Sequence, residues 1–186
     1  MRHTGLIAAS ALLFASVASP QTKYKVEGSC VSGAVDGQYT LYSGNSVKRV
    51  TGTFSHGKKN GPFFFFRSSG EQIALIPFRG DQMDGVVRMW FGPEMNPGQL
   101  KLESVYAAGK LNGPKRSWYP GGERRSTFYY TNDKLDRAEA WKPDGSPLSV
   151  EEAAGLAARD TEADRRFFEI LFRAIVENVP ACSKKN

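Results

Sequence analysis

The sequence predicts a mainly β protein, in which antiparallel β-hairpin repeats form a meander of one elongated sheet and a C-terminal α-helical segment packs on it. Three observations predict this fold. Glycines recur about every 24 residues, aromatic residues fill two fixed positions in each interval, and a helical pattern replaces the repeat after Ser149. The chain accordingly divides into a signal peptide over 1–18, a repeat domain over 19–148 and a helical segment over 149–186.

The first 18 residues have the features of a secretory signal peptide. Arg2 precedes an apolar run over 6–14, and small residues lead to a cleavage site after Ala18. The run is shorter than the roughly 20 residues that cross a bilayer as a helix. The alternatives are an N-terminal membrane anchor and a buried helix. A signal peptide predicts a periplasmic or secreted protein.

The two cysteines of the chain, Cys30 and Cys182, lie 152 positions apart. In an oxidising compartment an even pair predicts a disulfide, and the alternative is two free thiols. A bond across so long a loop would stabilise the fold by up to roughly 5 kcal/mol in the chain-entropy model. We expect it to tie the start of the folded body to its end.

Four repeat units follow one another, and each begins with a glycine that comes directly after Asp or Asn. The units are residues 37–60, 61–84, 85–112 and 113–136, where the third has four extra residues within 93–98. Because Asn-Gly and Asp-Gly favour the positive φ angles of type I′ turns, hairpins are predicted near Asn60-Gly61, Asp84-Gly85 and Asn112-Gly113. Second turns are predicted near Gly70 and Gly122.

Aromatic residues stand five positions and, allowing for the insertion, seventeen positions after each glycine. The first set is Tyr42, Phe66, Trp90 and Trp118, and the second is Phe54, Phe78, Tyr106 and Tyr130. We expect each set to form a stripe across neighbouring strands. The run Phe63–Phe66 predicts a strand buried on both faces, and insertion into lipid is its alternative.

This pattern resembles the bacterial variant of the MORN repeat. The best match is Gly113-Pro-Lys-Arg-Ser-Trp118-Tyr-Pro-Gly-Gly122-Glu123, together with the segment from Tyr106 through Lys110 to Gly113. The resemblance covers about residues 36–145. It implies an elongated β-meander that contacts proteins or lipids, and it implies no catalytic residues.

The segment after the repeats predicts a helix that begins with the capping box Ser149-Val-Glu-Glu152 and ends before Pro180. A second, weaker start at Thr161 predicts a break near Asp160. Residues 167–176 are apolar around most of the helix, so we expect the helix to pack on one face of the sheet, with Cys182 fixing its end. The alternative is a helix that binds a partner.

The positive charge indicates acidic partners, with ordinary solubility charge as the alternative, and the motifs of common enzymes are missing. Without residues 1–18 the chain has 24 basic and 19 acidic residues, and the excess lies in the repeats. His56 is the sole histidine after residue 18, and its place in a predicted turn predicts an exposed side chain. We therefore expect no catalytic residues, no metal, no cofactor and no nucleic-acid partner, although an enzyme with an unrecognised site remains an alternative.

These observations predict an exported interaction or scaffolding module that is not an enzyme and binds a protein partner in the cell envelope. The alternative is binding to a membrane surface or to an anionic glycan. The repeats hold more aromatic residues than one helix can cover. We therefore predict a contact surface in the third and fourth units, formed by Arg88, Trp90, Arg116 and Trp118.

Overall fold

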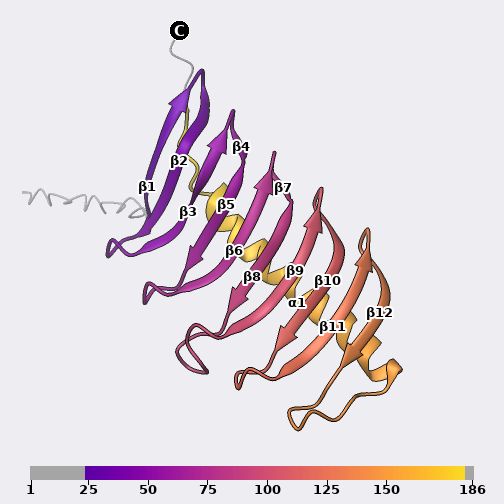
Figure 1. Cartoon of the computed structure of the whole chain (residues 1–186). Coiled ribbons are helices and arrows are strands. Elements are labelled where there is room, and N and C mark those ends of the chain that lie inside the picture. Colours follow the sequence, from indigo (N-terminus) through magenta and orange to yellow (C-terminus); the bar gives the residue numbers. More distant parts are fainter. Residues whose placement is uncertain (1–23, 183–186) are drawn as a thin grey trace, which may run out of the picture.

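The computed structural model describes residues 24–182, which form one open antiparallel sheet with one long helix across it (Figure 1). Ten strands follow one another in chain order from β1 to β12, and the two-residue strands β4 and β7 pair beside this path. The predicted fold class is confirmed. The proposed signal peptide, residues 1–18, lies outside the described residues.

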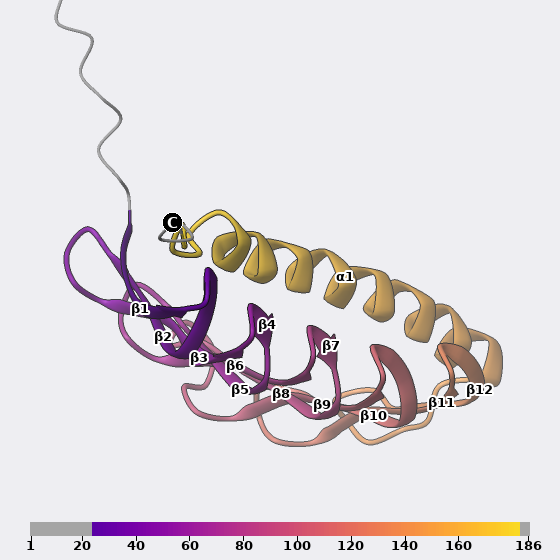
Figure 2. The same cartoon turned by 90° about the horizontal axis from the view of Figure 1, so that it is seen from above.

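The strands come first in the chain and the helix last. The strands are β1 (Tyr24–Val31), β2 (Ala34–Ser43), β3 (Lys48–Ser55), β4 (Lys58–Lys59), β5 (Gly61–Phe66), β6 (Gln72–Arg79), β7 (Gln82–Met83), β8 (Gly85–Trp90), β9 (Leu100–Ala107), β10 (Lys110–Trp118), β11 (Arg124–Thr131) and β12 (Lys134–Ala140). The helix is α1 (Val150–Val176). It lies along one face of the sheet, with its C-terminal end near β1 (Figure 2).

The tight turns lie four residues before the predicted centres, so that prediction was wrong. The turns are His56-Gly57, Gly80-Asp81 and Ala108-Gly109, and both residues of each have positive φ. This is the type I′ geometry. One residue of each turn, His56, Asp81 or Ala108, is not glycine, and none of the three turns contains an Asn-Gly or Asp-Gly dipeptide. The second turns, at Gly70 and Gly122, are confirmed by the hydrogen bonds that close them.

The Asn-Gly and Asp-Gly dipeptides instead join each unit to the next. Gly85 and Gly113 have φ of 119° and 127°, a backbone conformation that residues with a Cβ rarely adopt. This conformation interrupts the regular pairing of the strands. Just before Gly85, the carbonyl of Met83 accepts a hydrogen bond from the Gly109 N–H at 2.8 Å, in the following turn. The Asp84 carboxylate accepts another from the Ala108 N–H at 3.3 Å. The dipeptide thus anchors the turn of the next unit.

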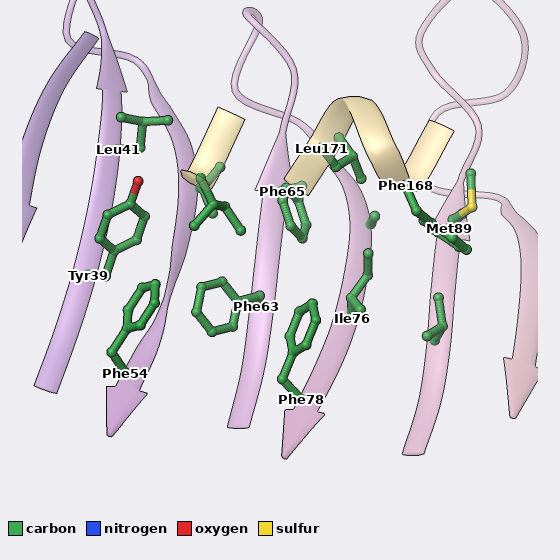
Figure 3. Packing of buried hydrophobic residues seen from close by; sticks show 14 of the residues in the cluster. Tyr39, Leu41, Phe54, Phe63, Phe65, Ile76, Phe78, Met89, Phe168 and Leu171 are labelled. Carbon is green, nitrogen blue, oxygen red and sulfur yellow. The ribbon is translucent and has the colours of Figure 1, made fainter. Parts of the chain in front are cut away.

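The second aromatic set forms the predicted stripe, beneath the helix. Phe54 and Phe78 contact Phe63 edge to face at centroid distances of 5.6 and 5.3 Å, and Phe78 contacts Phe172 of α1 at 5.4 Å. Figure 3 shows Phe54, Phe63 and Phe78 on consecutive strands, with Tyr39 beside Phe54. The repeated aromatic residues therefore supply the core with a row of rings that is buried against α1.

Strand β5 is buried on one face only, so the prediction of burial on both faces was wrong. Phe63 and Phe65 are 0% and 1% exposed, whereas Phe64 and Phe66 keep intermediate exposure. The reason is architectural: α1 covers one face, and no element within residues 24–182 covers the other.

The helix begins as predicted. Ser149 accepts a hydrogen bond from the Glu152 N–H, and the Glu152 carboxylate accepts one from the Ser149 N–H. The break expected near Asp160 does not occur, because α1 runs without interruption to Val176. The polar residues Asp160, Thr161 and Asp164 instead contact Arg125 and Lys115 of the sheet. No helix among the described residues is long and apolar enough to span a membrane.

Cys30 and Cys182 form the predicted disulfide, with their Cα atoms 5.7 Å apart. The bond joins strand β1 to the segment that follows α1. The disulfide thereby links the first strand to the C-terminal end of the helical segment.

Replacing both cysteines, as Cys30→Ser with Cys182→Ser, should lower the free energy of unfolding by about 2–5 kcal/mol, because the unfolded chain regains the entropy of a long loop. Urea unfolding followed by circular dichroism measures this loss. Wild-type protein treated with a reductant is the matched control and should show the same loss. Equal stability of the oxidised and reduced forms would contradict the prediction.

Candidate functional site

Arg88 and Arg116 lie on the sheet face that α1 leaves uncovered. Their neighbours Val87, Met89 and Lys115 are buried on the helix side, and side chains alternate along a strand. In cross-strand register, Glu103 stands between the two arginines. Its carboxylate pairs with Arg88 Nε at 3.1 Å and with Arg116 Nη1 at 3.5 Å. The structure therefore brings the two predicted arginines together around one acid.

Trp90 and Trp118 are the last residues of β8 and β10, at the ends of the strands where the second turns lie. Both side chains keep intermediate exposure. Each stands at a β-bulge. The Arg124 guanidinium lies 4.8 Å from the centre of the Trp118 ring. Tyr42 and Phe66, at the same repeat position, lie under Lys25 and Lys48 at 5.7 and 6.0 Å. Three of the four residues in the first aromatic set, Tyr42, Phe66 and Trp118, thus lie beside a cation.

The fourth unit departs from the other three beneath the helix. Two positions after the unit glycine, the first three units place Tyr39, Phe63 and Val87, each 0% exposed, whereas the fourth places Lys115 at 2%. At two further repeat positions an apolar residue of the first three units is replaced by a polar residue in the fourth. Leu41, Phe65 and Met89 are replaced by Ser117, and Val50, Ala74 and Leu102 are replaced by Ser126. A polar cluster takes the place of core.

Helix α1 supplies the partners of this cluster. Lys115 Nζ lies 2.7 Å from Asp164 Oδ2 and donates to Thr161 Oγ1 at 3.1 Å, and the Tyr130 hydroxyl lies 2.8 Å from the same Thr161 oxygen. Burial raises the pKa of Asp164, and the charge of Lys115 opposes this shift. The ion pair is nearly enclosed, because the Lys115 side chain is 3% and that of Asp164 19% exposed.

A second ion pair joins Arg125 to Asp160. Both terminal nitrogens of Arg125 bind the Asp160 carboxylate, with Nη2 3.1 Å from Oδ1, and Nη1 also donates to Ser117 Oγ at 3.3 Å. The hydrogen bond to Asp160 raises the pKa of Arg125. Arg125 is the extra residue of the β-bulge opposite Trp118, which explains how it reaches the helix side beside Ser126.

A cavity of about 350 Å³ opens beside these ion pairs, between α1 and strands β9 to β11. Its polar lining is Lys101, Ser117, Arg125, Asp160 and Asp164. Its apolar lining is Phe91, Met95, Leu102, Trp118, Tyr119, Pro120 and Ala163. The four-residue insertion of the third unit supplies Met95, and Asn96 Nδ2 fastens this loop to the Pro120 carbonyl at 2.7 Å.

The sequence predicted residues that lie on the uncovered face, but the polar cluster and the cavity were not predicted. The signal was available, because Lys115 occupies a repeat position that is aromatic or aliphatic in the other units. His56 lies in a tight turn with 93% of its side chain exposed, as predicted. No three His, Cys, Asp or Glu residues within 24–182 are grouped to hold a metal ion.

The chain matches no protein-family model, and no curated protein is significantly similar to it.

Replacing Lys115 by Met should lower the free energy of unfolding by about 3 kcal/mol at neutral pH, because a buried Asp164 carboxylate loses its partner. Losing Lys115 should raise the pKa of Asp164 further. The folded protein then holds a proton that the unfolded chain releases, so the deficit is complete above the folded pKa and shrinks as the pH falls through it. Urea unfolding over a pH series measures both effects.

The double variant Lys115→Met with Asp164→Leu should regain most of the lost stability, since it restores the apolar pair of the other units. Lys110→Met, at an exposed position of the same strand, is the matched control. A deficit that does not change with pH would show that the Asp164 carboxylate is not its cause.

Proposed function

We propose that this protein is an exported, non-enzymatic binding module of the MORN-repeat kind, which captures a protein partner on the uncovered face of its sheet. The observation that carries the proposal is that one helix covers one face only, while Arg88, Arg116 and the two tryptophans lie on the other face and its edge. Arginine and aromatic side chains together are typical anchors of protein interfaces.

Export is supported by the Cys30–Cys182 bond, because structural disulfides persist mainly in oxidising compartments. The signal-like pattern of residues 1–18 agrees with it. We therefore propose that the partner is a protein of the cell envelope or its surroundings.

The partner surface is proposed to be acidic. Cations recur beside the outer aromatic rings from one end of the sheet to the other, at Lys25, Lys48, Arg124 and Arg137. Near Arg88 and Arg116, Glu103 supplies one carboxylate for two guanidinium groups, which leaves a net positive charge there. An acidic segment laid across the strands would meet this charge and stack on the rings.

The same cations support the second candidate, binding to an anionic membrane surface or glycan. A row of cations with neighbouring aromatic rings suits a flat anionic surface as well as a protein. Vesicles that contain anionic lipid, sedimented with the protein at low and high salt, separate this candidate from the first. Binding that high salt abolishes and that needs no protein partner would favour the membrane.

The double variant Arg116→Glu with Trp118→Ala should lower capture of the partner from envelope extract at least about tenfold, because it removes a charge and an anchor from the contact surface. Circular dichroism establishes that the variant is folded.

The matched control makes the same kinds of change on the exposed side of α1, as Arg159→Glu with Ile170→Ala. It should retain capture. Equal capture by the wild type and the Arg116/Trp118 variant would place the contact surface elsewhere, and loss in both variants would mean that overall charge decides binding.

A further inference from the structure

We propose that the cavity between α1 and strands β9 to β11 binds a small carboxylic acid with an apolar body. This site lies on the helix side of the sheet and shares Trp118 with the contact surface, and the inference does not depend on the identity of any protein partner. It rests on the charge, the lining and the size of the cavity.

Charge selects an anion. Asp160 and Asp164 each pair with a cation, Arg125 and Lys115 respectively. Lys101 lines the cavity near enough to Asp164 for its charge to oppose the rise in the pKa of that carboxyl, yet it forms no ion pair or hydrogen bond with any residue of 24–182. Its ammonium group is the charge that a ligand carboxylate would neutralise.

A neighbouring donor points to the same chemistry. A second cavity of about 150 Å³ shares Lys101, Ala163 and Asp164 with the first, and Arg67 lines it. The Arg67 Nε is buried and has no hydrogen-bond partner among the described residues. A buried donor without a partner costs free energy, which an acceptor oxygen in this second cavity would recover.

The lining selects an apolar body. Phe91, Trp118 and Tyr119 supply aromatic walls, while Met95 is 61% exposed at the loop that the insertion adds. Apolar walls with a few polar groups are typical of small-molecule sites. Since a water molecule occupies about 30 Å³ of liquid, a cavity of about 350 Å³ accommodates roughly a dozen non-hydrogen atoms.

The test titrates the full mature protein, with its disulfide intact, with 2-naphthoate and decanoate in a calorimeter. Either acid should bind at one site per chain. The neutral isostere 2-naphthamide should bind at least about tenfold more weakly than 2-naphthoate, because it cannot neutralise Lys101. If neither acid binds, or if the amide binds as tightly as the acid, the proposal is wrong.

Two pairs of variants locate the site. Lys101→Met should weaken binding of the acid at least about tenfold, whereas Lys110→Met, at another exposed lysine outside both cavities, should not change it. Ala163→Phe should abolish binding by filling the cavity, because Ala163 lines it. Ala158→Phe, at an exposed alanine on the other side of α1, should leave it intact. Equal effects within either pair would overturn the assignment.

Discussion

The fold depends on one helix covering one face of a sheet that has no second layer among residues 24–182. The two dimensions agree. The 27 residues of α1 extend about 40 Å at about 1.5 Å per residue. The ten strands of the main path span about 43 Å at about 4.8 Å per strand. Because the helix crosses the strands, every repeat unit contributes to the same contact (Figure 1). The length of the helix thus sets the number of repeat units whose inner face can be buried.

Apolar contact alone would not determine where along the sheet the helix sits, because the hydrophobic effect has no direction. The core is divided into a cluster under the C-terminal half of α1 and another under its N-terminal half. The pairs Lys115–Asp164 and Arg125–Asp160 lie between them and match specific atoms. Buried ion pairs add little net stability but can define a register. We infer that they do so here, and the cavity lies beside them, where apolar side chains do not fill this part of the contact.

Sequence patterns predicted the features that depend on local chemistry or on spacing. The capping box at Ser149, the stripe of Phe54 and Phe78 and the cysteine pair are of this kind. The turn positions were misplaced because Asn-Gly can form a tight turn or a bend between units, and only strand pairing distinguishes them. The helix break near Asp160 was wrong for a related reason: whether a polar residue ends a helix or faces a buried partner depends on Lys115 and Arg125, about 35 to 50 positions earlier in the chain.

The bond between Cys30 and Cys182 also changes how the molecule bears force. A pull applied to the two ends of the chain passes from residue 30 directly to residue 182 through the sulfur atoms. Every strand from β2 to β12, and the helix that covers them, lies inside the loop that this bond closes. The repeats are therefore shielded from tension between the termini. Only chemical reduction would expose them to unravelling one hairpin at a time.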